Sequence, residues 1–160
     1  MFKSYVTSEF RNGWKKKPEE KEKTCVFCER YKKKEYIFST KSSFVIVNEY
    51  PYNNGHLMIL SVRHVKDIRD LKEEELRDML STSKKFLTLI ENTYDIHSFN
   101  LGINLGEDSG ATLEHLHFHL VPRWGGDSGF LETTSDTKVL KETPEQTKIR
   151  LIEALKNNKI

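Results

Sequence analysis

Three histidines alternate with apolar residues in the second half of the chain, where residues 115–119 read His-Leu-His-Phe-His. Side chains at positions i, i+2 and i+4 of a β-strand share one face, so this spacing predicts a row of three imidazoles. Imidazole titrates near neutral pH and can serve as nucleophile, proton carrier or hydrogen-bond donor. The competing interpretations are a solvated strand face and a metal site built from alternate positions. Solvated faces usually mix residue types, which favours a chemical role here.

A histidine that attacks phosphorus needs one neutral ring nitrogen directed at the substrate and the other held by an acceptor. It also needs donors for the phosphoryl oxygens, whose negative charge must be neutralised during transfer. The segment before the histidine row offers candidates for these donors: Asn104, Gly106, Ser109, Gly110 and Thr112. Taken alone, a glycine-containing segment of this kind says little, because most such segments are only turns.

The composition indicates one folded domain with a charged surface. A chain of 160 residues is long enough to bury a substantial core. Its net charge of +2 is too small a basic excess for a dedicated nucleic-acid-binding protein. No stretch approaches the roughly 20 apolar residues of a membrane span, and the first residues lack the apolar core of a signal peptide. We therefore expect a cytoplasmic protein with a flexible arm at residues 1–24 and a single domain at residues 25–160.

Hydrophobic periodicity predicts both strands and helices. The expected strands cover residues 36–38, 44–47, 57–62, 99–105 and 116–121. Glu73 begins an acidic first turn, and an apolar stripe follows at helical spacing: Leu76, Met79, Leu80, Phe86, Leu87 and Ile90. Thr143, Pro144 and Gln146 have the capping pattern of a C-terminal helix. This order predicts an α+β fold, in which a long helix and a C-terminal helix cover one face of an antiparallel sheet of about five strands.

The histidine row resembles the motif of a known family. Residues 115–121 match the pattern His-φ-His-φ-His-φ-φ, with φ apolar, of the histidine triad superfamily of nucleotidyl hydrolases and transferases. The resemblance covers roughly residues 25–130. The continuation Pro-Arg-Trp-Gly-Gly-Asp at residues 122–127 is similar to the bacterial branch that acts on diadenosine tetraphosphate by hydrolysis or phosphorolysis. The resemblance implies a HIT-like fold, a nucleotide substrate, a homodimer and no organic cofactor.

The activity implied by this resemblance is the cleavage of dinucleoside polyphosphates through a covalent nucleotidyl-histidine intermediate, with phosphate or water as the acceptor. Within the same superfamily, a nucleoside phosphoramidate hydrolase would use the same intermediate. A nucleotide-binding protein with negligible turnover is the alternative from another functional class.

The resemblance also implies catalytic roles for individual residues. His117, the middle histidine, would be the nucleophile that takes the nucleotidyl group, and His119 would contact the α-phosphoryl oxygens. His56 would support the histidine strand from a neighbouring strand. Thr112 would place a hydroxyl near the scissile bond.

Five further positions are candidates for nucleotide binding. The resemblance implies that Asn48 binds the ribose and Asn104 the phosphate. Strand alternation puts Ile46 beside Asn48, and Met58 beside His56, so the two apolar side chains are expected to wall a base pocket. The competing interpretation for Ile46 and Met58 is ordinary core packing. The competing interpretation for Asn48 is that it simply ends a strand. Arg123 is expected to hold an incoming phosphate.

The two cysteines, Cys25 and Cys28, are too few for a disulfide framework, and cytoplasmic thiols stay reduced. A redox pair, half of a metal site and inert thiols remain as interpretations. A redox pair usually begins a helix in a βαβ unit, which the sequence does not indicate. Zinc-containing histidine triad proteins use such a pair together with two histidines, so the resemblance implies a structural zinc site with His64 and His115 as the other ligands.

Overall fold

The computed structural model describes residues 24–111, 113–127, 129–135 and 137–157. These residues belong to two compact units. The larger contains the described residues of 24–127 and 140–160, and the smaller contains those of 128–139, including the helix α4 (Phe130–Ser135). The expected arm lies outside the described residues except for Thr24, and the single domain expected at residues 25–160 stays a prediction.

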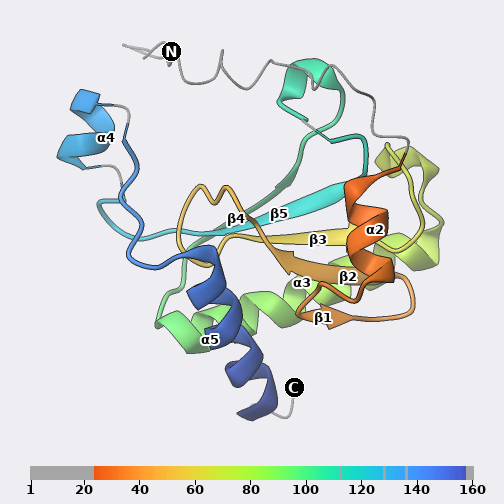
Figure 1. Cartoon of the computed structure of the whole chain (residues 1–160), viewed down its shortest axis with the longest axis horizontal. Helices are drawn as coiled ribbons and strands as arrows, with labels where there is room; N and C mark the ends of the chain where they lie inside the picture. Colours follow the sequence, from red (N-terminus) through yellow and green to blue (C-terminus); the bar gives the residue numbers. More distant parts are fainter. Residues whose placement is uncertain (1–23, 112, 128, 136, 158–160) are drawn as a thin grey trace. The chain divides into compact units, whose positions relative to one another are not determined.

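The larger unit is built on a five-stranded sheet in which all neighbouring strands are antiparallel (Figure 1). The strands are β1 (Phe38–Ser39), β2 (Ser43–Val47), β3 (Leu57–Ser61), β4 (Phe99–Ile103) and β5 (His117–Pro122). Their order is β1-β2-β3-β5-β4, so the histidine strand lies between β3 and β4. The expected antiparallel sheet is confirmed.

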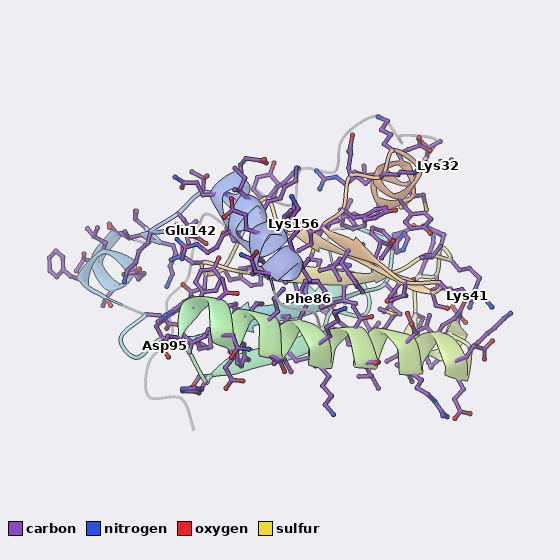
Figure 2. All side chains as sticks on the ribbon, turned by 90° about the horizontal axis from the view of Figure 1, so that it is seen from below. Lys32, Lys41, Phe86, Asp95, Glu142 and Lys156 are labelled. Atoms are coloured by element: carbon purple, nitrogen blue, oxygen red, sulfur yellow. The ribbon has the colours of Figure 1, made fainter. Side chains whose placement is uncertain are left out.

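One face of the sheet is covered by the long helix α3 (Glu73–Tyr94) and the C-terminal helix α5 (Pro144–Asn157). Figure 2 shows Phe86 on the side of α3 that faces α5. The buried core on this face consists of Val45, Val47, Leu57, Ile59, Met79, Phe86, Leu89, Ile90, Ile96, Phe118, Leu120 and Leu151. Leu80 was expected in the stripe but is 49% exposed, because it lies about 100° around the helix from the buried Met79.

The other face of the sheet is covered by a short helix that the sequence did not predict, α2 (Val26–Lys32). Its Phe27 packs in a second buried cluster with Phe44, Ile46, Met58 and Leu60. The two predicted helices thus lie on one face as expected, and this third helix lies on the other. Phe27 is the only buried residue of this seven-residue helix, so the segment has no apolar stripe for a periodicity argument to detect.

The predicted start of α5 is confirmed by its hydrogen bonds. Thr143 Oγ1 accepts from the backbone N–H of Gln146 at 3.2 Å, and Gln146 Oε1 accepts from the backbone N–H of Thr143 at 2.8 Å. Among the described residues, no helix is long and apolar enough to cross a membrane.

Candidate active site and metal site

The strand β5 directs its histidines to the face of the sheet that α2 covers. Antiparallel pairing puts His117 opposite Leu60 and His119 opposite Met58. The ring of Phe27 on α2 lies 5.6 Å from the ring of His117. His117 is therefore buried, with 8% of its surface exposed.

The hydrogen bond of His117 determines which of its ring nitrogens can react. Its Nδ1 lies 2.7 Å from the backbone carbonyl oxygen of His115. A carbonyl oxygen can only accept, so Nδ1 carries the hydrogen and Nε2 has the free electron pair. Burial lowers the pKa of His117 below its usual range, so the ring is neutral at pH 7. This is the state that nucleophilic attack by Nε2 requires.

A second chain of hydrogen bonds determines the state of His119. The backbone N–H of Tyr52 donates to His56 Nδ1 at 3.0 Å, so the hydrogen of the neutral His56 ring is on Nε2. That Nε2 donates to His119 Nδ1, also at 3.0 Å, which leaves the hydrogen of His119 on its own Nε2. His119 Nε2 is buried and has no hydrogen-bond partner among the described residues. It is a donor available to an anion.

Burial keeps both of these imidazoles uncharged. It lowers the pKa of His56 to about 3 and that of His119 to about 4, and neighbouring histidines contribute in the same direction. The ring of Tyr52 stacks on His56, with 4.8 Å between the ring centroids. The hydrogen-bond directions derived for neutral rings therefore apply at neutral pH.

The three residues expected around the nucleoside lie together on the face that α2 covers. Ile46 and Met58 are opposite each other in the β2–β3 pair, and both are buried in the cluster around Phe27. Asn48 is also buried, and its Nδ2 lies 3.3 Å from Nδ1 of His56. The apolar pair thus contributes to core packing, and its role in base binding stays a prediction.

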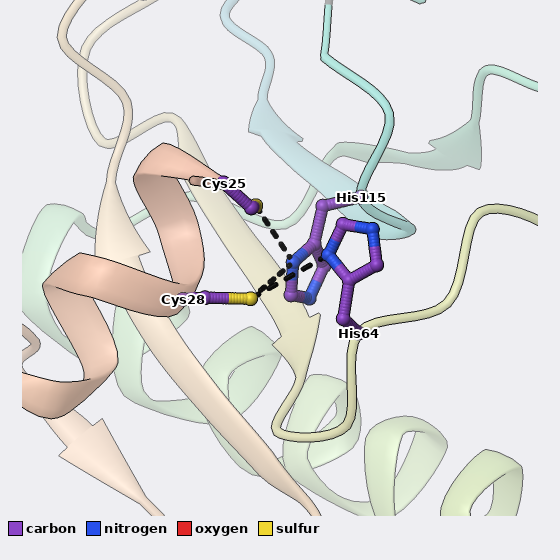
Figure 3. A group of neighbouring side chains, drawn as sticks. All are labelled: Cys25, Cys28, His64 and His115. Atoms are coloured by element: carbon purple, nitrogen blue, oxygen red, sulfur yellow. Dashed lines mark hydrogen bonds between the residues drawn. The ribbon is translucent and has the colours of Figure 1, made fainter. Parts of the chain in front are cut away.

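The four residues expected to bind metal converge from three segments (Figure 3). Cys25 is the N-cap of α2 and Cys28 lies in its first turn, while His64 follows β3 and His115 precedes β5. All four candidate ligand atoms lie within 4.8 Å of one another. The cysteine pair begins the helix α2, but α2 packs on a sheet whose described strands are all antiparallel, so it is not part of a βαβ unit, in agreement with the sequence interpretation.

The donor set fits a zinc ion. His115 Nε2 donates to the carbonyl oxygen of Ser61 at 2.8 Å, so the free electron pair of Nδ1 faces the sulfur of Cys25, 3.3 Å away. Two thiolates and two imidazoles are a typical closed shell for structural zinc. Burial and the adjacent Cys25 raise the pKa of Cys28 to about 11, so a cation that binds there displaces a thiol proton.

Arg123, expected to hold phosphate, is engaged within the protein. Its Nε and Nη2 donate to the two carboxylate oxygens of Asp127 at 2.7 and 3.0 Å, and its Nη1 donates to Asn100 Oδ1 at 2.6 Å. Asp127 also accepts from Asn53 Nδ2 at 2.8 Å. The sequence analysis did not predict that Asp127 binds Arg123 and Asn53. An acidic residue four positions after Arg123, across a glycine turn, is a signal that would have indicated the Arg123–Asp127 pair. The phosphate-binding role of Arg123 stays a prediction.

The segment between β4 and β5 contains the remaining expected residues. Asn104 directly follows β4, and its Nδ2 lies 4.0 Å from the position that a Cβ atom on Gly110 would occupy. Gly106 and Gly110 have φ of 82° and 87°, conformations that favour glycine and explain both residues as turn formers. Thr112 lies outside the described residues.

More than half of the chain matches a known protein family. The HIT domain family model matches residues 29–126. The chain belongs to the HIT domain family. The resemblance to the histidine triad superfamily, inferred from the histidine row, is thereby confirmed.

Two curated relatives illustrate the sequence similarity of the HIT-domain chain. The AP-4-A phosphorylase of Mycobacterium tuberculosis is 39% identical over 109 residues, which cover 68% of this chain and 56% of the relative. The asymmetrical bis(5'-nucleosyl)-tetraphosphatase of Schizosaccharomyces pombe is 34% identical over 91 residues, which cover 57% of this chain and 50% of the relative. The chain thus spans about half the length of these relatives.

Solved structures of other HIT proteins share the fold. A Zn-bound histidine triad family protein from Mycobacterium smegmatis superposes with a TM-score of 0.69 at 22% identity, covering 84% of this chain and 94% of that one. The C. elegans NitFhit protein gives a TM-score of 0.61 at 27% identity, covering 74% of this chain and 26% of that one. These similarities confirm the α+β fold of the HIT domain.

Proposed function

We propose that this protein cleaves dinucleoside polyphosphates of the diadenosine tetraphosphate type through a covalent nucleotidyl-His117 intermediate. The observation that carries the proposal is the buried, neutral His117, whose Nδ1–H is held by the His115 carbonyl and whose Nε2 is free. The available N–H of His119 on the same strand face supports it. The names of the two curated relatives, a phosphorylase and a tetraphosphatase, support the same substrate class.

The reaction has two displacement steps at the α-phosphorus. In the first, His117 Nε2 forms a bond to phosphorus while the bond from phosphorus to the bridging oxygen breaks, and ATP leaves from diadenosine tetraphosphate. His119 Nε2–H donates to a phosphoryl oxygen whose charge increases in the transition state. In the second, an oxygen of the acceptor attacks and the N–P bond breaks. Water gives AMP and releases a proton, whereas phosphate gives ADP.

Further residues would bind the substrate. Asn48 holds the ribose, and Ile46 and Met58 contact the base. Asn104 donates to the phosphate, and Thr112 places a hydroxyl near the scissile bond. The juxtaposition of Asn48 with His56 supports the nucleoside side of this assignment, because it links the ribose position to the hydrogen-bonded pair of His56 and His119.

The metal assignment is a structural zinc held by Cys25, Cys28, His64 and His115, and no organic cofactor takes part. A closed shell of four protein ligands leaves no position for water activation, so the ion when bound stabilises the fold. Its ligands join the first turn of α2 to the ends of β3 and β5, and His56 rather than His115 supports His119.

The protein is proposed to act as a homodimer in the cytoplasm, without dedicated nucleic-acid binding. In the described part of the chain β4 is an edge strand, and its Leu101 is 44% exposed. An apolar surface at this edge, on the face of the sheet that α3 covers and lined by the side chains of Ile68, Leu101, Ile103 and Phe118, supports pairing with a second copy.

The test is to incubate the purified protein with diadenosine tetraphosphate or adenosine 5'-phosphoramidate and to compare the two kcat/KM values. We expect the tetraphosphate to be the better substrate and a rapid quench in alkaline denaturant, in which the N–P bond survives, to trap AMP on His117. Both reactions share the intermediate, so only the preference between the two substrates distinguishes them. A preference for the phosphoramidate would favour the alternative hydrolase. Nucleotide binding without products and without trapped AMP would indicate a binding protein.

A further inference from the structure

Gly102 leaves a gap beside the catalytic histidines. It is the residue of β4 that pairs with His119 of β5, so the two residues share the face that carries the histidine row. Directly opposed side chains in an antiparallel pair have their Cβ atoms about 5 Å apart. Gly102 has no side chain, and a Cβ atom built on it would meet no heavy atom of the chain within 4 Å.

The imidazole of His119 does not fill this gap. Its Nδ1 bonds to Nε2 of His56, which directly precedes β3. Because β3 and β4 flank β5 on opposite sides, this hydrogen bond draws the ring of His119 toward β3 and away from Gly102. The space above β4 stays open, and Gly102 is exposed.

The backbone gives no reason for glycine at this position. Gly102 is not among the glycines with positive φ, which are Gly55, Gly106, Gly110 and Gly126. No neighbour crowds it, and glycine inside a strand weakens the strand. A glycine in such a place often marks the close approach of a ligand.

Two amide side chains lie on either side of the gap along the strand. By alternation, Asn100 and Asn104 share the face of Gly102. The residues assigned to the nucleoside lie on the far side of β5, on β2 and β3. A substrate whose α-phosphorus is at His117 thus has its nucleoside over β2 and β3. The rest of its phosphate chain can then extend over β4, on the other side of β5.

We infer that Gly102 makes room for the phosphates of the leaving nucleotide, so that these phosphates cross β4 between Asn100 and Asn104. Gly102 is then a specificity-determining residue, because a side chain there would obstruct substrates with a phosphate chain beyond the α-phosphorus. This inference rests on the proposed function, since it assumes that His117 is the site of attack.

The test measures nucleotide affinity in Gly102→Ala and Gly102→Val variants built on His117→Ala, so that no substrate is consumed. Affinity for diadenosine tetraphosphate should fall several-fold with alanine and roughly 100-fold with valine, because the added methyl groups overlap the bound phosphates and overpack the site. Affinity for AMP, which has no further phosphate, should stay within twofold. The melting temperature should not fall, because alanine and valine suit a strand better than glycine.

Gly125→Ala on the same background is the matched control. A Cβ atom there also meets nothing within 4 Å and the φ is not positive, but Gly125 lies in the turn after β5. It should leave both affinities unchanged. The inference would be overturned if the Gly102 variants bound the tetraphosphate as tightly as the His117→Ala parent does. It would also be overturned if they lost as much affinity for AMP as for the tetraphosphate, or if their melting temperature fell. Failure of the proposed function would appear separately, as absence of turnover in the unsubstituted protein.

Discussion

The carbonyl oxygen of His115 accepts the Nδ1–H of His117 at 2.7 Å, while Nδ1 of the same His115 lies 3.3 Å from Cys25 Sγ. One residue therefore belongs both to the candidate metal site and to the support of the candidate nucleophile. Its ring is directed to the sulfur atoms and its peptide group to the reacting imidazole. Through this residue, the position of the nucleophile depends on the geometry of the Cys-His cluster.

Replacement of His117 by alanine or glycine should abolish chemistry and leave nucleotide binding nearly unchanged. In the proposed mechanism the middle imidazole bonds to substrate only during reaction, whereas Asn48 and the apolar residues would contact the bound substrate in its ground state. Turnover should fall by several orders of magnitude with a change of at most a few-fold in dissociation constant. Steady-state kinetics and calorimetric titration with AMP check both. A variant that kept a tenth of the original turnover would contradict the assignment of the nucleophile.

The purified protein should contain about one zinc ion per chain, as a closed shell of two cysteines and two histidines requires. Substitution of Cys25 or Cys28 by serine should lower the melting temperature more than it lowers the activity measured at low temperature, because metal-binding energy is partly folding energy. Elemental analysis and thermal melting with and without a chelator test this. A metal-free protein of full stability would contradict the zinc assignment.

Phosphate should be the preferred acceptor when it is abundant. The continuation at residues 122–127 resembles that of small bacterial phosphorylases over six consecutive residues, whereas the resemblance to the hydrolase pattern at His119 concerns a single position. The reaction is run on diadenosine tetraphosphate with and without millimolar phosphate, and the nucleotides are separated. ADP should appear only with phosphate. If ATP and AMP form under both conditions, the acceptor is water.

His56 should make the fold acid-sensitive. Its pKa is about 3 in the folded state against an ordinary value of 6.5, so the folded state binds fewer protons in this range. The stability that this depressed pKa contributes is fully present above pH 6.5 and is lost as the pH falls toward 3, with a slope of up to about 1.4 kcal/mol per pH unit. Urea unfolding of the His56→Asn variant should show a smaller decline between pH 6.5 and 4 than the unsubstituted protein.

His97 provides the control for this pH experiment. It is exposed, and its hydrogen bond to Glu91 raises its pKa, so its contribution is lost as the pH rises, not as it falls. His97→Gln should therefore retain the acid-induced decline. An identical pH slope in the unsubstituted protein and in His56→Asn would show that His56 is not the group responsible.

The sequence predicted the elements that have a clear strand or helix periodicity, and the helix ends that have strong local signals. Alternation placed His117 and His119 on one face, and the capping residues marked the start of α5 correctly. The helix α2 was missed because a single buried side chain, Phe27, gives no period. Tyr52 was missed because its contact with His56 is made by a backbone N–H, which every residue except proline has.

The arrangement of α2 has a consequence for the behaviour of the protein in solution. A helix of seven residues is far below the length at which an isolated helix persists in water, so α2 depends on its anchors, Phe27 and the two cysteines. If the cysteines are oxidised or stripped of metal, the anchoring weakens, and the apolar cluster beneath the helix is uncovered. Exposed apolar surface next to β-strands promotes aggregation. We therefore expect the redox state of the two thiols to affect solubility as well as fold.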